Sequence, residues 1–570
     1  MKKLSELFDI DSDVEIKRIA INSKQVEPGD LFVCTMGVKA DRHDFIDDAI
    51  KNGASAIVVS KDVGKKSVPI IKVDNTNEEL PRICSKFYDY PDKKLKMIGI
   101  TGTDGKTSTT TIIQTLIGKD NCGYIGTNGY SYKDKKGDTE NTTPDSHNLY
   151  RYFNDFVEAG CKYCSMEASS EAFFRNRLTE LEFDISGITN ITREHLNIHG
   201  SYENYIECKC KLFKQTKKDG CCILNHDDEA FEICKKACNG QVVTYGKGED
   251  NTLQIVDYKV YPTHTDITYK YDSKLHNIKS PLLGGFNVYN LACAILCCLS
   301  LGFKWEEFQD NIKNIYVDGR LEMLKTDTPY YVMVDYAHTP NGISNLLNFV
   351  HTLDINRSIV VIGSAGERDY LKRPIMGETI LSNASYAIFC YEDPRSEDPL
   401  DIINQLVSTA KAKHTNYEIE VDRHKAIEKA INMAKDKDIV LILGKGNETY
   451  QKLKNETIYF NDVEEGYKAV EKRKQREKEE EDKLVNKLET VKEKLEKEII
   501  KIKVKVGKED KVFGSVSSKQ ILTALKEKGY NLNKNQIIIN NPISSLGYHK
   551  VIIELHKRVK AVINVELIGD

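Results

Sequence analysis

The stretch KMIGITGTDGKTS, residues 96–108, places a short apolar run directly before a glycine-containing loop and a threonine-rich helical start. A strand, a loop and a helix in this order can hold phosphate, because loop amides and the helix N-terminus face the anion. The spacing departs from a standard P-loop, whose first glycine would fall on Ile100. Lys106 is expected to neutralise the β- and γ-phosphates, and Thr107 to bring a hydroxyl to Mg²⁺.

Similar apolar runs alternate with helical segments along the first 470 residues. The clearest are GASAIVVS, YCSMEAS, SIVVIGSAG and DIVLILGKG. Several end in Gly or Ser just before a helix, which is typical of βαβ units and parallel sheets. The predicted fold class is therefore α/β, with ligands at the carboxyl ends of the strands. At about 150 residues per domain, a chain of 570 residues predicts roughly four domains.

Composition excludes several classes of protein. With 40% apolar and 29% charged residues and a net charge of −4, the chain has no global attraction for nucleic acid or membranes. Its N-terminus, MKKLSELFDI, leads into no secretory signal, and its longest apolar run, residues 291–303, predicts a buried helix rather than a membrane span. Fifteen cysteines then predict reduced thiols and a cytoplasmic location, and the lone pair Cys161 and Cys164 is expected to be structural.

Many stretches besides TGTDGKT resemble the Mur ligases, most closely those of the MurE type, from about residue 20 to 465. They include NSK (22–24), TTP (142–144), MEASSEAF, TNITREHLNIHG, LGGFN, DGRLE, VDYAHTPNG, EDPRSE and GKGNE, in the order that the family has them. The resemblance implies three domains: a small UDP-substrate-binding α/β domain (1–95), a central P-loop ATPase domain (96–316) and a C-terminal Rossmann-like domain that binds an amino acid (317–462).

The resemblance also implies a reaction. Such ligases use ATP to activate a carboxylate of UDP-N-acetylmuramoyl-L-alanyl-D-glutamate as an acyl phosphate, which the amine of a diamino acid attacks during peptidoglycan synthesis. Phosphoryl transfer is mainly positioning and charge neutralisation, so cations and metal ligands are needed. Two Mg²⁺ ions are expected, held by Thr107, Glu167, His195 and a carbamylated Lys209; Lys211 is the neighbouring alternative, and a helix-terminal carboxylate is the alternative for Glu167.

The remaining candidate residues follow the family motifs. Those implied for catalysis are Lys106, Lys209 and His338. Those implied for ATP are Gly102, Thr103, Asp104, Gly105, Lys106, Thr107, Ser108, Asn287, Asn290, Arg320 and Asp335. Those implied for the UDP substrate are Ser23, His43, Asn141, Thr142, Thr143, Ser169, Arg175 and Arg177. Those implied for the amino acid are Arg368, Arg373, Asp393, Arg395, Gly444 and Glu448.

The identity of the amino acid depends on residues 392–395, Glu-Asp-Pro-Arg. In the ligases that add meso-diaminopimelate this motif ends in Arg, whose guanidinium can bind the distal carboxylate through two parallel hydrogen bonds. The chain departs from the family at Asp104, Glu171, Glu194 and Asn447, and Asp393 stands where Asn is usual. Because an acid here favours a bare ammonium, L-lysine stays the alternative to diaminopimelate.

The end of the chain differs in composition and resemblance. Residues 463–505 carry mixed charges with no Gly or Pro after Gly466, which predicts a long solvated helix, and a small α+β domain is expected at 506–570. Together they resemble the connecting helix and C-terminal domain of bacterial large-subunit ribosomal protein nine. Lysines at 501, 503, 505, 508, 511 and 519 suit contact with rRNA phosphates. A solubilising appendage is the alternative, as is a ribosome-associated protein with a vestigial ligase half.

Overall fold

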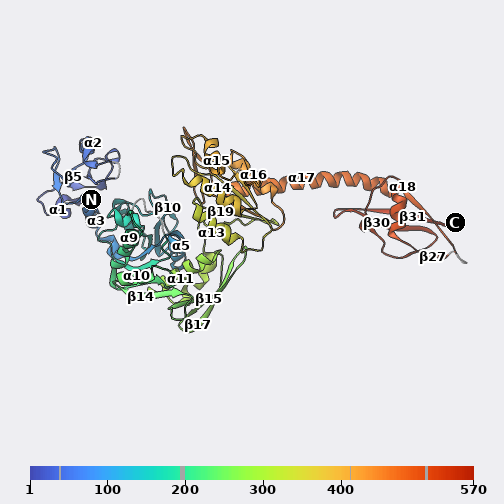
Figure 1. The fold of residues 1–570 in the computed structure, drawn as a ribbon, viewed down its shortest axis with the longest axis horizontal. Coiled ribbons are helices and arrows are strands. Elements are labelled where there is room, and N and C mark those ends of the chain that lie inside the picture. Colours follow the sequence, from blue (N-terminus) through green and yellow to red (C-terminus); the bar gives the residue numbers. More distant parts are fainter. Residues whose placement is uncertain (38–39, 193–198, 411, 507–510, 570) are drawn as a thin grey trace. The chain divides into compact units, whose positions relative to one another are not determined.

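The computed structural model describes residues 1–37, 40–192, 199–410, 412–506 and 511–569. The chain divides into two compact units, Met1–Gly466 and Tyr467–Asp570. The first unit contains three sheets of four or more strands, which follow one another along the chain, in blue, cyan to green and yellow to orange in Figure 1, and two short two-stranded pairs. All three contain parallel strands with helices between them, which confirms the α/β class.

The first sheet consists of four parallel strands in the order β3-β4-β5-β6. Its strands are β3 (Arg18–Ala20), β4 (Asp30–Val33), β5 (Ala56–Val59) and β6 (Ile70–Lys72), and its larger helices are α2 (Ile46–Lys51) and α3 (Thr76–Phe87). Every residue of β4 and β5 is buried, as expected for parallel strands covered on both faces.

The central sheet has eleven strands in the order β10-β9-β8-β11-β7-β12-β13-β14-β15-β16-β17. Parallel pairing runs from β8 to β15, and antiparallel hairpins flank it at both ends. Its strands are β7 (Lys96–Thr101), β8 (Cys122–Gly126), β9 (Gly129–Tyr132), β10 (Lys135–Gly137), β11 (Tyr163–Glu167), β12 (Phe183–Ile188), β13 (Thr216–Asn225), β14 (Gln241–Gly246), β15 (Leu253–Val260), β16 (Thr265–Tyr271) and β17 (Lys274–Ser280). The helices that matter for the site are α5 (Lys106–Ile117), α6 (Ser146–Glu158), α7 (Ser170–Phe174), α9 (Tyr202–Lys214) and α11 (Gly285–Ser300).

The third sheet has the order β18-β19-β23-β20-β21-β22, and only the edge strand β18 is antiparallel to its neighbour. Its strands are β18 (Glu322–Met323), β19 (Tyr331–Asp335), β20 (Ser358–Ile362), β21 (Tyr386–Phe389), β22 (Tyr417–Ile419) and β23 (Ile439–Leu443). Its helices are α13 (Pro340–Val350), α14 (Lys372–Asn383), α15 (Pro399–Val407) and α16 (Arg423–Met433), and a hairpin of β24 (Tyr450–Lys452) and β25 (Thr457–Tyr459) follows.

The helix α17 (Asp462–Lys497) begins in the first unit. Arg423 donates to the carboxylate of Asp462 over 2.8 and 2.6 Å, with both side chains fully buried, so the start of the helix is anchored. The prediction that the helix continues to about residue 505 is wrong, because it ends at Lys497. Residues 499–504, IIKIKV, form the strand β26 (Ile499–Val504), because their alternating exposed and buried side chains match the period of a strand.

The second unit has a four-stranded sheet in the order β26-β31-β30-β28 and the short pair of β27 and β29. Its other elements are β27 (Lys511–Val516), α18 (Ser518–Glu527), β28 (Ile537–Ile538), β29 (Ile543–Ser545), β30 (Gly547–His556) and β31 (Val559–Gly569). Strands and helices pack on one apolar core that includes Ile521, Val551 and Ile563. The predicted small α+β domain is confirmed.

Three smaller predictions can be compared with the fold. The apolar run at 291–303 lies mostly in α11, whose side chains from Leu291 to Cys298 are buried. All fifteen cysteines are free, and Cys161 and Cys164 are buried in a hydrophobic core. Within the described ranges, no cluster of three or more metal-ligating side chains occurs, and no helix has the length and apolarity needed to cross a bilayer.

Candidate active site

The loop after β7 has the geometry of a phosphate-binding loop. β7 ends at Thr101 and α5 begins at Lys106, so only residues 102–105 separate strand from helix. Gly102 and Gly105 have φ angles of +149° and +82°, and a Cβ on either would clash with Thr189 or Asn290. Lys106 Nζ donates to the carbonyls of Gly102 and Thr103 over 2.9 and 2.7 Å. The lysine therefore already lies across the mouth of the loop.

A cavity of about 580 Å³, called here the P-loop cavity, opens in front of this loop. Most residues implied for ATP line it: Thr103, Asp104, Gly105, Lys106, Thr107, Ser108, Asn287, Asn290, Arg320 and Asp335. Asp335 is fixed by the amides of Leu321 and Ala337 at 2.7 and 2.8 Å, and burial raises the pKa of its carboxyl. Gly102 is absent from the lining but supplies the carbonyl that Lys106 contacts.

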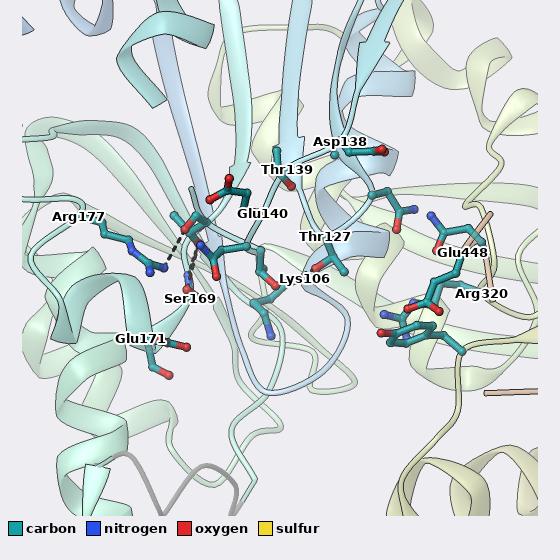
Figure 2. Close-up of a pocket in the computed structure, with 18 of the residues that line it drawn as sticks. Lys106, Thr127, Asp138, Thr139, Glu140, Ser169, Glu171, Arg177, Arg320 and Glu448 are labelled. Atoms are coloured by element: carbon teal, nitrogen blue, oxygen red, sulfur yellow. Dashed lines mark hydrogen bonds between the residues drawn. The ribbon is translucent and has the colours of Figure 1, made fainter. Parts of the chain in front are cut away.

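A second cavity of about 560 Å³, called the substrate cavity, shares four lining residues with the first. These are Lys106, Thr127, Thr142 and Arg320, and Figure 2 shows Lys106 between the two labelled groups Arg177–Ser169 and Arg320–Glu448. Because one lysine faces both cavities, a phosphoryl group bound at the P-loop would lie next to any carboxylate held in the substrate cavity.

Five of the residues implied for the UDP substrate line the substrate cavity: Asn141, Thr142, Thr143, Ser169 and Arg177. Thr143 Oγ1 donates to the carbonyl of Glu167 over 2.8 Å, and Arg177 Nη1 donates to the carbonyl of Thr143 over 3.0 Å. The amide of Ser169 donates to Thr143 Oγ1 over 3.1 Å. These bonds hold the end of β11, the start of α7 and the TTP turn as one wall of the cavity.

A third cavity, of about 260 Å³, lies beside Arg175 and Arg177 and is lined from the first sheet's domain by Thr35, Arg42 and Asn77. Arg175 and Arg177 pair with Glu171 and Asp145, each over 2.6 Å. Sequence reasoning did not identify Arg42 and Asn77 as site residues. The position of Arg42 next to the motif residue His43 is the signal that could have indicated it. Arg42 is a third guanidinium in the lining, so arginines outnumber the lining carboxylates Glu171 and Asp145, and the cavity suits an anionic group.

Ser23 and His43 line none of these three cavities. The imidazole of His43 is buried, with Nδ1 2.6 Å from Asp41 and Nε2 accepting from the amide of Ser60 over 3.0 Å. Ser23 is also buried, and its carbonyl accepts from Asn52 over 2.9 Å. Both residues hold the loops of the first domain together.

The candidate metal ligands are only partly described. Glu167 is fully buried at the end of β11, lines the P-loop cavity and accepts from the amide of Thr127 over 2.8 Å. Thr107 lines the same cavity from the first turn of α5. A carboxylate and a hydroxyl are oxygen donors that suit Mg²⁺. His195 and Glu194 lie outside the described residues.

Lys209 lies buried on α9 and lines the substrate cavity, whereas Lys211 is exposed. Lys209 Nζ donates to the carbonyl of Gly102 over 2.6 Å and lies 4.5 Å from the ring centre of Tyr205. The hydrogen bond from Nζ to this carbonyl is one that an unmodified lysine ammonium makes. Its location beside the P-loop nevertheless separates it clearly from its neighbour Lys211.

The amino-acid candidates Asp393 and Glu448 meet at one buried lysine. Lys445 is fully buried, and its Nζ lies 2.9 Å from both Asp393 Oδ1 and Glu448 Oε2. Burial acts to lower the pKa of Lys445, but the two carboxylates outweigh it and raise that pKa. Asp393, Lys445 and Glu448 are called the acid–lysine cluster here. Of its members, Glu448 lines the substrate cavity.

Arg395 lies in the same region, and one nitrogen of its guanidinium lacks a hydrogen-bond partner among the described residues. Its backbone has a φ of +54° and donates to the carbonyl of Lys452 over 3.0 Å, but its buried Nε has no hydrogen-bond partner in the described parts of the chain. Gly444 has a φ of +111°, and a Cβ there would come within 2.6 Å of the Glu392 carboxylate. Gly444 therefore allows the two motifs to pack closely.

The sequence relatives decide the family. Matches to Mur ligase domain descriptions cover residues 15–94 (catalytic domain), 100–298 (middle domain) and 319–446 (glutamate ligase domain). A UDP-N-acetylmuramoyl-L-alanyl-D-glutamate–2,6-diaminopimelate ligase of Clostridium perfringens is 36% identical over 476 residues, which are 82% of this chain and 97% of that protein. This chain belongs to the Mur ligase family. A ligase of the same name from Fusobacterium nucleatum is also 36% identical, over 82% of this chain and 96% of its own length.

Solved structures agree with this assignment. A structure of a ligase with the same name has a TM-score of 0.60 and 26% identity, and it covers 83% of this chain and 99% of its own. The MurF ligase of Thermotoga maritima in complex with ADP has a TM-score of 0.57 at 19% identity, covering 81% of this chain and 100% of its own, and shows the shared fold. Residues 486–569 match the C-terminal domain of ribosomal protein L9.

Three candidates of this Mur ligase lie away from the described cavities. Arg368 is exposed, while Arg373 is buried and donates to Glu397, Gln405 and the carbonyl of Ala365 over 2.8–3.1 Å. His338 Nδ1 lies 2.9 Å from the carbonyl of Tyr336, and burial lowers the pKa of the imidazole to about 4. Arg373 therefore supports a loop, and His338 is neutral near pH 7.

Proposed function

We propose that this Mur ligase joins meso-diaminopimelate to UDP-N-acetylmuramoyl-L-alanyl-D-glutamate at the expense of ATP. The observation that carries the proposal is the meeting of the P-loop cavity and the substrate cavity at Lys106 and Arg320. Two relatives are named as 2,6-diaminopimelate ligases, and the matches cover 97% and 96% of their lengths. These names support the proposed substrates.

The reaction has two balanced steps. A substrate carboxylate oxygen attacks the γ-phosphorus of ATP, the bond to the β-phosphate oxygen breaks, and ADP leaves. The free amine of the diamino acid then attacks the acyl carbon, phosphate leaves with the former carboxylate oxygen, and the nitrogen loses a proton. Lys106 and Arg320 line both cavities, which supports a role for them in neutralising the charge that moves during the transfer. Exclusion of water from the cavities would protect the acyl phosphate.

Bound Mg²⁺ would neutralise phosphate charge during this transfer. Thr107 and Glu167 would hold it, and the family motif adds His195. A carbamate on Lys209 would replace an ammonium by an anion beside Gly102, and so supply a ligand for a second ion. The presence of the carbamate is testable by the mass of the intact protein and by rescue of a Lys209→Ala variant with a short carboxylic acid.

The acid–lysine cluster changes the choice between diaminopimelate and L-lysine. In the sequence, Asp393 favours a bare ammonium. In the structure, however, this carboxylate is already paired with Lys445 over 2.9 Å. The neighbouring Arg395 retains a buried Nε without a partner among the described residues, and a substrate carboxylate would satisfy it. Both features support diaminopimelate, whose distal end carries a carboxylate as well as an ammonium.

The test of the proposal is ADP release in the presence of ATP, Mg²⁺, UDP-N-acetylmuramoyl-dipeptide and one amine. We expect turnover with meso-diaminopimelate and a product whose mass equals the sum of the two substrates less one water. Turnover with L-lysine alone would contradict the choice of amine, and no turnover with any diamino acid would contradict the ligase function.

A second activity is proposed for the tail. Lys501, Lys503, Lys505 and Lys519 are exposed in the second unit, whose sequence matches the C-terminal domain of ribosomal protein L9. We propose that these lysines contact rRNA phosphates, so that binding weakens as salt increases. Filter binding of the isolated residues 467–570 to rRNA at two salt concentrations tests this, and absence of binding at low salt would leave the appendage hypothesis.

Free thiols throughout the chain support a cytoplasmic location.

A further inference from the structure

Four cysteines gather in one apolar core of the central domain, where α9, β13 and α10 (Phe231–Ala237) meet. Cys210 lies on α9, Cys222 on β13, Cys234 on α10 and Cys238 directly after α10. The first three belong to the core, and Cys238 packs against it. None of the four lines any of the three cavities described above, so the ligase site does not account for this cluster of thiols.

The four thiols form two pairs. Hydrogen bonds join Cys210 to Cys234 and Cys222 to Cys238. The first pair is closed to solvent, since Cys210 and Cys234 are only 3% and 1% exposed. In the second pair Cys222 is buried but Cys238 is half-buried. A small dissolved oxidant can therefore reach the second pair, beside Cys238, more easily than the first.

The chain around Cys222 is built to hold its sulfur as a thiolate. Cys222 Sγ lies 3.5 Å from Thr216 Oγ1, and the backbone amides of Asn239 and Gly240 also donate to it. Asn239 Nδ2 donates to the carbonyl of Thr216 over 2.8 Å and holds this segment against β13. The approach requires glycine at 240, because a Cβ there would lie 2.5 Å from the carbonyl oxygen of Gly220.

Hydrogen-bond donors that point at a sulfur favour its ionised form. The hydrogen bond from Cys238 lowers the pKa of Cys222 to about 7, although burial opposes this change, and the same bond raises the pKa of Cys238. A large fraction of these pairs therefore carries one negative charge near pH 7. The thiolate is the form of cysteine that peroxides oxidise, and a second thiol beside it can complete a disulfide.

We propose that Cys222 and Cys238 are a peroxide-sensitive modification site, at which a reversible disulfide ties the end of α10 to β13. The Cys222 thiolate attacks one oxygen of hydrogen peroxide, the O–O bond breaks, hydroxide leaves and Cys222 becomes a sulfenic acid. The Cys238 sulfur then attacks the Cys222 sulfur, and the S–O bond breaks. The oxygen leaves as water with the proton of Cys238. Two sulfurs are thereby oxidised to one disulfide, and the peroxide is reduced to water and hydroxide.

The test is peptide mapping of the full chain after treatment with hydrogen peroxide, alkylation of the remaining thiols and digestion with trypsin. Cleavage after lysine places Cys222 in the peptide 219–235 and Cys238 in the peptide 237–247. The wild type should lose two of its fifteen alkylatable thiols and yield these two peptides joined, and dithiothreitol should restore both thiols. The measurement needs no ligase substrate, so its outcome is independent of the proposed function.

A variant identifies the bonded sulfur, because the peptide 219–235 also contains Cys221 and Cys234. Cys222→Ser should abolish the joined peptides. The matched control is Cys221→Ser, which replaces the neighbouring half-buried thiol and should leave the joined peptides intact. If thermal melting shows that Cys222→Ser is poorly folded, fragmentation of the joined wild-type peptides locates the bond directly. Absence of joined peptides in the wild type, or a bond to Cys221 or Cys234 in place of Cys222, would overturn the proposal.

Discussion

The P-loop and the acid–lysine cluster both bring charged side chains to the substrate cavity, but they are built in opposite ways. Lys106 is placed by its own neighbours, since its two carbonyl contacts come from residues three and four positions away. Lys445 instead joins Glu448 to Asp393, which is 52 residues distant in the sequence. A locally built site keeps its geometry when distant residues change, whereas a site built from distant segments depends on every ion pair. The P-loop also has distant contacts, from Thr189, Asn190 and Lys209, but the carbonyl contacts of Lys106 itself are local, so amine selection should be the more sensitive of the two to changes elsewhere.

The largest expected effect is at the P-loop, where the contacts of Lys106 are local. Lys106→Ala should lower ADP release by about 10²–10³-fold, because a preorganised charge at the transferring phosphoryl is lost. Thermal melting should change little, since α5 keeps its backbone bonds. The exposed Lys119→Ala is the matched control and should retain full turnover. Substantial ADP release by a folded Lys106→Ala variant would refute the assignment of the P-loop.

Amine selection should respond next. Arg395→Ala removes a buried charged donor, so the preference for diaminopimelate over L-lysine should fall by about 10-fold or more, on the scale of about 1–3 kcal/mol for an unsatisfied group. Competition between the two amines in one reaction gives this ratio directly. Arg82→Ala, an exposed arginine of α3, should leave it unchanged. An equal ratio in wild type and Arg395→Ala would show that another group selects the amine.

A smaller, pH-dependent effect is expected at Glu392. Burial raises the pKa of this carboxyl to about 7 from 4.5; Arg423 and Lys445 oppose the rise, and Glu448 and Asp393 add to it. The folded state therefore favours the protonated carboxyl. The stabilisation that this proton gives the folded state is fully present below about pH 4.5 and is lost as pH rises to about 7, at up to about 1.4 kcal/mol per pH unit. Glu392→Gln should therefore melt progressively higher, relative to wild type, between pH 5 and pH 8. The exposed Glu456→Gln should show no such trend, and the same flat result for Glu392→Gln would contradict the prediction.

The smallest effect should come from removing the tail. A shortened chain ending at Gly466 keeps Asp462 and its bonds to Arg423, and it keeps all three cavities. Ligation should proceed at close to the full rate, measured as ADP release under the same conditions. A loss of activity with melting unchanged would show that the second unit takes part in ligation.

The same contrast explains what could be predicted from the sequence. The strand, loop and helix around Lys106 and the buried helix α11 follow from local patterns, and the structure confirms them. The partner of Asp393 could not be found in this way, because nothing in EDPRSE indicates that Lys445 packs against it. The end of α17 was also misjudged, since charge pairs continue past Lys497 while the alternation of IIKIKV already favours a strand.

The central claim is that a substrate carboxylate in one cavity receives the γ-phosphoryl group from the other. Labelling both oxygens of that carboxylate with ¹⁸O and analysing the released phosphate by mass spectrometry tests it most directly. Because the acyl phosphate breaks at its carbon–oxygen bond when the amine attacks, each phosphate released during ligation should carry one ¹⁸O atom. Unlabelled phosphate, formed while the amide product accumulates, would contradict the account.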